Sequence, residues 1–222
     1  MSDRTLTLVI GNKNYSSWSL RPWLLLKQAQ IPFKEILIPL YEGDYKEQIL
    51  KYSHHGKVPI LIHQSETVWE SLAIGEYVAD LFPQKELWPK NVHDRAVARS
   101  ISSEMHSGFV HLRTNMPMNL RASHPGKGRT PESQRDIARV LEIWEGCREQ
   151  FKAKGPFLFG HFTVADAMFA PVVTRFRTYG VDLTGPCAEY SKTILNLPSF
   201  KEWEKEGIKE TQFIKASEIY SK

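Results

Sequence analysis

The stretch KVPILIHQSETVWES, residues 57–71, decides how the first third of this chain folds. Val58–Ile62 is an apolar run rich in β-branched residues, which is typical of a buried strand. The polar residues that follow predict a hairpin turn, and Thr67–Trp69 predicts a second short strand. Glu70-Ser71 then opens a segment whose apolar residues recur with helical spacing. The stretch therefore predicts a β-β-α unit.

The residues before this unit predict another strand–helix–strand arrangement. Thr5–Ile10 and Phe33–Leu40 are apolar runs of strand length, and residues 20–29 between them have the pattern of a helix. Two strands joined by a crossover helix pair in parallel with a right-handed connection. A short charged helix is expected over Tyr45–Tyr52. The order is then β-α-β-α-β-β-α, an α/β domain.

Two motifs in the opening stretch resemble a known family. V-P-x-L at Val58-Pro59, followed after the hairpin by E-S-x-A-I-x-x-Y at Glu70-Ser71, is similar to the N-terminal domain of cytosolic glutathione transferases. The resemblance implies a thioredoxin-like domain over residues 1–82 that binds glutathione. It implies that Pro59 is cis, that the backbone of Val58 pairs with the cysteinyl part of glutathione, and that Glu70 and Ser71 hold its γ-glutamyl end. An extended peptide added to a strand edge gains affinity through main-chain hydrogen bonds.

The serines of the loop before the first helix are the second chemical feature. Hydroxyl groups at this place are ordinary N-caps, which accounts for at least one of them. A hydroxyl donor and the positive end of a helix also favour the thiolate of a thiol whose usual pKa is about 8.5. By resemblance to the zeta-class loop S-S-C-S-W-R-V-R, the stabilising hydroxyl belongs to Ser16, with Ser17 as the alternative. Trp18 stands where that loop has cysteine, and the absence of cysteine at position 16 disfavours disulfide exchange.

Cations lie just before Val58. Lys57, His54 and His55 would suit the glycine carboxylate of glutathione, since a cation strengthens hydrogen bonds to a carboxylate. The alternative is that all three belong to a solvated loop. We expect Lys57 to contribute to glutathione binding.

The rest of the chain predicts a linker and an all-α domain. Residues 83–92 contain two prolines and no periodicity, as a linker does, and residues 93–222 are helical in pattern. Residues 115–130 are rich in proline and glycine and predict an exposed loop. Thr163 and Asp166 form a capping box at the start of a helix that we expect to be core and not part of a site.

One predicted helix face in this domain mixes apolar and polar side chains. Met105, His106, Phe109 and Arg113 recur with helical spacing. One interpretation is a core face with a satisfied histidine. By resemblance, the same face lines the pocket for the second substrate, where methionine and phenylalanine suit an adaptable apolar ligand. His106 and Arg113 would suit an anionic or carbonyl-bearing one.

Composition narrows the classes of partner. The 222 residues carry a net charge of +4, and the basic residues are scattered, so no nucleic-acid interface is expected. A mild positive potential favours an anionic substrate such as glutathione. Cys147 and Cys187 form no disulfide framework and no metal-ligand spacing, so we expect buried thiols and no metal. Without a signal peptide or an apolar run of membrane-spanning length, we expect a cytoplasmic protein that does not bind membranes.

The residues and the resemblance together predict a glutathione transferase that attacks a small electrophile. A zeta-like maleylacetoacetate isomerase is an alternative, although Trp18 in place of cysteine disfavours it. A non-catalytic glutathione-binding or scaffold protein of the same fold is another. The resemblance also implies a homodimer.

Overall fold

The N-terminal part of the computed structural model, which describes residues 5–221, is built around a four-stranded sheet. The strand order is β2-β1-β3-β4, in which β1 pairs parallel with β2 and antiparallel with β3, and β3 pairs antiparallel with β4. The elements are β1 (Leu6–Ile10), α1 (Ser17–Gln28), β2 (Phe33–Leu37), α2 (Tyr45–Leu50), β3 (Ile60–His63), β4 (Glu66–Trp69) and α3 (Ser71–Leu81).

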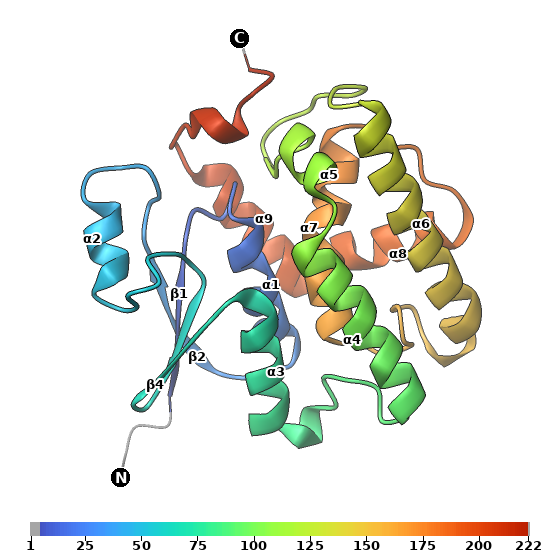
Figure 1. Cartoon of the computed structure of the whole chain (residues 1–222), viewed down its shortest axis with the longest axis horizontal. Helices are drawn as coiled ribbons and strands as arrows, with labels where there is room; N and C mark the ends of the chain where they lie inside the picture. The colour runs from blue at the N-terminus through green and yellow to red at the C-terminus, as the bar shows by residue number, and fades with distance from the viewer. Residues whose placement is uncertain (1–4, 222) are drawn as a thin grey trace.

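The sheet separates two layers of helix. Helices α1 and α3 pack on the face that looks toward the rest of the molecule, and the short α2 lies on the opposite side (Figure 1). Ile49 of α2 covers Val9 and Ile60 in a small core of its own. Successive side chains of a strand point to opposite faces of the sheet, so the strands contribute to two cores, one on each face.

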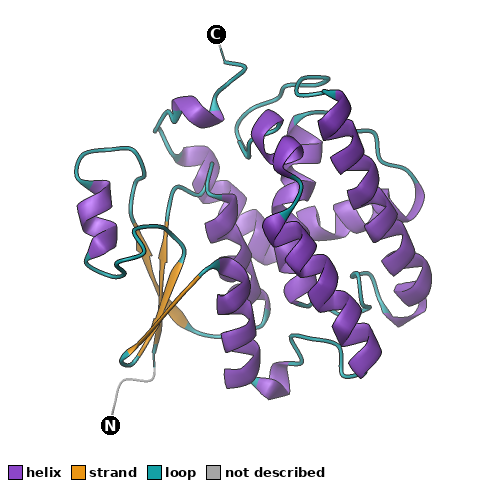
Figure 2. Cartoon of the chain, viewed as in Figure 1, coloured by secondary structure: helices purple, strands orange, loops and turns teal. Residues whose placement is uncertain are grey.

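The C-terminal part is helical (Figure 2). Nearly all of α7 is buried, and it packs against α1, α4 and α8. The capping box of Thr163 and Asp166 is present at its start, as predicted. The α-helices are α4 (Val92–Ser107), α5 (Val110–Asn115), α6 (Pro131–Phe151), α7 (Val164–Thr178), α8 (Gly185–Asn196) and α9 (Pro198–Lys209), with short 3-10 turns at Pro83–Lys85, Lys152–Lys154 and Lys215–Ser217.

The architecture confirms the predicted fold class, a thioredoxin-like α/β unit followed by an all-helical one. Cys147 and Cys187 are free and buried, also as predicted. No helix within residues 5–221 has the length and apolar character needed to cross a membrane.

Two predictions about the helical part are wrong. The helix expected through Met105 and Arg113 is broken at Gly108-Phe109, where Phe109 has a left-handed φ of 53°. A Cβ at Gly108 would lie 2.7 Å from the carbonyl oxygen of Glu104, so the turn that ends α4 is tight. The loop expected to be exposed over residues 115–130 is buried at 116–120, because Met116, Met118 and their neighbours enter the core beside α7.

Candidate active site

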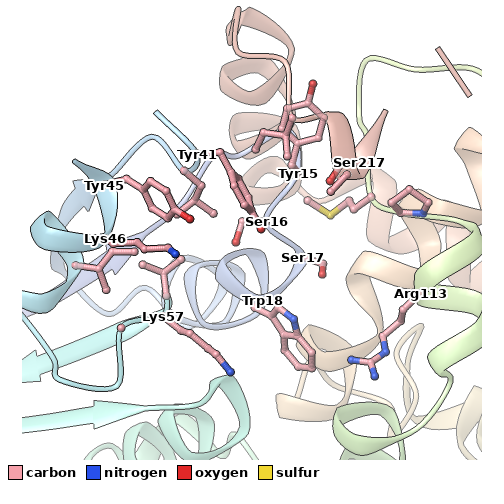
Figure 3. Close-up of a pocket in the computed structure, with 18 of the residues that line it drawn as sticks. Tyr15, Ser16, Ser17, Trp18, Tyr41, Tyr45, Lys46, Lys57, Arg113 and Ser217 are labelled. Carbon is pink, nitrogen blue, oxygen red and sulfur yellow. The ribbon is translucent and has the colours of Figure 1, made fainter. Parts of the chain in front are cut away.

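Two cavities meet at the start of α1. The larger has a volume of about 680 Å³ and the smaller about 320 Å³. Trp18, Lys57 and Val58 line both, so the two form a continuous system around these residues. Figure 3 shows the larger cavity, with the first turn of α1 at its centre and Arg113 on the side of the helical part.

The predicted serines lie at the N-terminus of α1 and line the larger cavity. Ser16 is the N-cap and accepts a hydrogen bond from the backbone N–H of Ser19 at 3.4 Å. Its Oγ also lies 2.7 Å from Oγ of Ser19, which accepts from the backbone N–H of Gly11. Oγ of Ser17 accepts from Nη2 of Arg175 at 3.2 Å. The two hydroxyls therefore have different supports, one within α1 and one from α7.

Val58 and Pro59 lie between the sheet and the cavities. The bond between them is cis, as the resemblance implied, and both residues line the smaller cavity. Val58 precedes β3, and its backbone N–H and C=O form no hydrogen bond with another residue in the range 5–221. These groups are available to an extended ligand.

Glu70 and Ser71 join β4 to α3. Glu70 has a φ of 67°, a strained value for a residue with a side chain, and strain of this kind gathers at functional sites. Its carboxylate oxygens lie 3.3 Å from Nε2 of His55 and 3.5 Å from Nε2 of His106. Oγ of Ser71 is buried, with no hydrogen-bond partner in the described part of the chain. Ser71 lines neither cavity, but a buried hydroxyl without a partner is costly, so it stays a candidate ligand contact beside Glu70.

The structure divides the four residues expected on the second-substrate face. His106 lines the smaller cavity, and Arg113 lines the larger one. Met105 and Phe109 line neither cavity and lie in the core. Met105 and His106 are neighbours on α4 and therefore point about 100° apart, and the break at Gly108-Phe109 turns Phe109 away from the face that continues α4.

Lys57 lines both cavities, and its contact with glutathione stays a prediction. His55 also lines the smaller one, but it faces Glu70 and stacks on Trp69 at 6.0 Å between ring centroids. His54 is exposed and lines neither cavity. Lys57 is therefore the best placed of the three cations for a carboxylate.

Sequence reasoning missed several cavity residues. Arg175 lines the larger cavity, so the expectation that α7 is core alone is wrong. A single arginine within the otherwise apolar run FAPVVTRF was the available signal. Lys46 of α2 and Ser217 of the C-terminal segment also line the cavity, and no local pattern marks either.

The chemistry of the site is that of polar and cationic side chains. Burial and nearby Arg21 lower the pKa of His106 below its usual value, which Glu70 offsets in part. Within residues 5–221 no group of three histidine, cysteine or acidic side chains is arranged to hold a metal ion. The arrangement can bind an anionic peptide and polarise a thiol at a helix N-terminus.

Comparison with known proteins gives the same family for both parts of the chain. The sequence profile of the glutathione S-transferase N-terminal domain matches residues 15–81, and that of the C-terminal domain matches residues 129–206. A probable maleylacetoacetate isomerase of Caenorhabditis elegans is 25% identical over 203 residues, 90% of this chain and 93% of that protein. Glutathione S-transferase U8 of Arabidopsis thaliana is 28% identical over 197 residues, 87% of this chain and 81% of that protein.

A solved structure shares the fold. It is a glutathione transferase homolog from Burkholderia with bound glutathione, which has a TM-score of 0.69 at 22% identity and covers 92% of this chain and 98% of its own. With both profiles in their expected order, the chain belongs to the glutathione S-transferase family and is, by that membership, a glutathione transferase.

Proposed function

We propose that this chain binds glutathione across the two cavities and activates its thiol with the hydroxyl of Ser16. In the reaction, the thiol proton leaves to water and the thiolate attacks an electrophilic carbon. A C–S bond forms, and in a substitution the leaving group departs with the electrons of the bond that breaks. The observation that carries the proposal is that the serine hydroxyls and the open backbone of Val58 face one cavity system.

The γ-glutamyl end is assigned to the smaller cavity. Glu70 would pair with the ligand's amino group, and the unpartnered hydroxyl of Ser71 would bond its carboxylate. Both contacts are charge-assisted and so are stronger than neutral hydrogen bonds. The cysteinyl part would pair with the backbone of Val58, which places the thiol toward Ser16 and Ser17. Lys57 is assigned to the glycine carboxylate, with Lys46 on the same side of the cavity in Figure 3.

Ser16 and Ser17 remain two candidates for the thiolate contact. A hydroxyl donates one proton, so the useful serine is the one whose proton is free to point at sulfur. Oγ of Ser17 accepts from Arg175, which leaves its own proton available. Oγ of Ser16 donates to Oγ of Ser19 at 2.7 Å, so this hydroxyl has to rotate for its proton to reach sulfur. We retain Ser16, which caps α1, as the thiolate contact and Ser17 as the alternative.

A second function has one supporting observation. Arg113 and Arg175 place two cations on the cavity wall, as an isomerase for a dicarboxylate such as maleylacetoacetate would need. Isomerisation by glutathione addition and release uses the same thiolate site. A side-by-side assay of cis–trans isomerisation on maleyl compounds and of conjugation on halo-aromatic compounds separates the two functions.

The proposal is tested by binding and by the state of the bound thiol. We expect calorimetry to show one glutathione site per chain, weakened in Ser71→Ala and unchanged in Ser65→Ala, which alters an exposed hairpin hydroxyl. Ultraviolet absorption against pH should show the bound thiol ionising below its usual pKa of about 8.5. Binding without a lowered pKa would indicate a non-catalytic glutathione-binding protein, and no binding would leave a scaffold.

The homodimer and the cytoplasmic location stay predictions. Sedimentation at micromolar concentration tests the first, since a mass near the 25.6 kDa of one chain would contradict a dimer.

A further inference from the structure

Three arginines surround Trp18 at the end of the larger cavity. We call Arg21 of α1, Arg113 of α5 and Arg175 of α7 the arginine cluster. The guanidinium carbons of Arg21 and Arg113 lie 4.1 Å and 5.4 Å from the centre of the Trp18 ring. Arg175 donates through Nη2 to Oγ of Ser17, the residue that precedes Trp18. The cluster is therefore assembled from three helices at the proposed site of chemistry.

No member of the cluster forms an ion pair within the described residues, although Asp136, which accepts from the backbone N–H of Leu112, partly offsets the lowering of the pKa of Arg113. Arg21 is 2% exposed and Arg175 is 5% exposed, yet their contacts are neutral. Arg21 donates through Nε to the carbonyl of Met168, and Arg175 donates to the carbonyls of Arg113 and Met116.

Buried charges normally come in pairs because removing an ion from water is expensive. Here the cost is visible in the guanidinium groups. Burial lowers the pKa of all three, neighbouring arginines lower those of Arg21 and Arg175 further, and that of Arg175 falls to about 10. An arginine guanidinium keeps its proton in proteins at neutral pH, so the three side chains are cations. Nη1 of Arg21 and Nε of Arg113 are also buried without a hydrogen-bond partner.

The cavity lining shows the same imbalance. Of the residues that the structure describes, those lining the larger cavity include four cationic side chains, Lys46, Lys57, Arg113 and Arg175, and no acidic one. In Figure 3, Arg113 extends from α5 toward the indole of Trp18, on the far side of the serines from Lys46. Under the proposed function, glutathione places its glycine carboxylate near the lysines. One thiolate near Ser16 does not balance three guanidinium groups, so the arginine cluster can stabilise a further anion.

We propose that the second substrate is an electrophile that carries a carboxylate or a similar oxyanion. Arg113 and Arg175 hold this group beside Trp18 while the reactive carbon faces the thiolate at the start of α1. Arg21 lies behind Trp18 and contributes its charge without lining the cavity. The inference rests on the proposed function and adds the chemical class of the electrophile.

The test compares two electrophiles that share a reactive centre and differ in charge. 4-Chloro-3-nitrobenzoate is an anion, and 4-chloro-3-nitrobenzamide is its neutral analogue. The thiolate displaces chloride from both, and each kcat/KM is divided by the uncatalysed rate with glutathione, which removes the difference in ring reactivity. The variants are Arg113→Met, which keeps an apolar stem against Trp18, and Arg139→Met as a control. Arg139 lies on α6 and pairs with Glu104 and Glu142, away from the cavities.

We expect the wild type to prefer the benzoate by about ten-fold to a hundred-fold, the range of a hydrogen bond to a charged group. The preference should fall toward one in Arg113→Met and persist in Arg139→Met. Turnover of the amide with no preference for the benzoate, or a preference that survives Arg113→Met, would overturn the inference alone.

A binding measurement keeps the two proposals separate if neither compound is turned over, which would count against the proposed function. The unreactive 3-nitrobenzoate and 3-nitrobenzamide are titrated into protein saturated with S-methylglutathione. Tighter binding of the benzoate, lost in Arg113→Met, supports the anion site. Equal binding of the two compounds contradicts it.

Discussion

The two ends of the cavity system differ in how their charges are balanced. At one end Glu70 stands between His55 and His106, so an acid and two bases lie within 3.5 Å and the group is exposed enough to be hydrated. At the other end the arginine cluster brings three cations together without an ion pair to any carboxylate of residues 5–221, and two of them are almost fully buried. Trp18 lies between the two ends, because its ring contacts His106 at one end and Arg21 and Arg113 at the other.

This difference in charge balance indicates which kind of ligand group each end binds. A balanced and hydrated acid can release its histidines and accept an ammonium group at small cost. A buried cluster of like charges is held in place by the rest of the fold, and it gains most when an anion arrives. We call the end with Glu70, His55 and His106 the glutathione end and the end with the arginine cluster the arginine end. We expect the glutathione end to govern affinity for glutathione. We expect the arginine end to govern which electrophile this chain accepts.

The largest effect is expected from Asp166→Ala, which destabilises α7, the helix that supports both ends of the cavity system. α7 starts at the capping box of Asp166 and carries Arg175, and it packs on α1, which carries the serines. Asp166→Ala leaves the buried backbone N–H groups of Leu158 and Thr163 without acceptors. At about 1–3 kcal/mol for each of the two groups, the free energy of unfolding should fall by about 2–6 kcal/mol. Chemical denaturation followed by circular dichroism measures it.

Asp182→Ala is the matched control, because Asp182 is exposed in the loop after α7 and should change stability by less than about 0.5 kcal/mol. Equal stability of Asp166→Ala and wild type would show that α7 does not depend on its cap. The common support of the two ends would then have to lie elsewhere.

The second largest effect is expected from Ser16→Ala, at the start of α1 between the two ends. Ser16→Ala should raise the pKa of the bound thiol and lower kcat/KM at neutral pH by about ten-fold to a hundred-fold. Raising the pH should restore part of the rate, since the thiolate then forms without help. Glutathione affinity should change little, because the other contacts remain.

Ser17→Ala is the comparison variant, and pH–rate profiles of both at saturating glutathione decide between them. A displaced profile for Ser17→Ala beside an unchanged one for Ser16→Ala would assign the thiolate contact to Ser17. It would also make Arg175 a positioning residue, since its guanidinium group donates to Oγ of Ser17.

The same contrast explains what the sequence could predict. The glutathione end is encoded within fifteen consecutive residues, where strand, turn and helix start are local and Val58, Glu70 and Ser71 follow from one motif. Ser16 lies at a helix start that local capping rules identify. The fold class follows from the same local patterns and from the order of the elements.

The arginine end could not be predicted in this way. Arg21 and Arg175 meet because α1 and α7 pack together, and Arg113 joins them where Arg175 donates to its backbone carbonyl, so no spacing along the chain records the cluster. Met105 and Phe109 were placed on the pocket because their spacing continues in phase through Gly108-Phe109. The helical pattern does not reveal that the backbone turns there to a φ of 53°.

The third effect tests the glutathione end alone. Glu70→Gln keeps the shape of the side chain and removes the charge that would pair with the amino group of glutathione. We expect KM for glutathione to rise about ten-fold with little change in kcat, because a ground-state contact is lost. The preference for an anionic electrophile should be unaffected. Glu66→Gln, in the exposed hairpin of β4, is the control. A changed electrophile preference in Glu70→Gln would contradict independent ends.

The smallest effect concerns His106, the residue that touches both ends. Burial and Arg21 lower its pKa, Glu70 raises it, and Arg113 lowers it again. A histidine whose pKa is lower when folded binds its proton more readily when unfolded, so its contribution to stability is complete above a pH of about 6.5 and is lost as the pH falls. The free energy of unfolding should therefore decline more steeply below that pH in wild type than in His106→Gln. The difference in slope should correspond to less than one proton taken up on unfolding. His93→Gln, exposed on the same helix, should keep the wild-type slope. If the slopes of wild type and His106→Gln agree, Glu70 rather than the arginine cluster sets the charge of this residue.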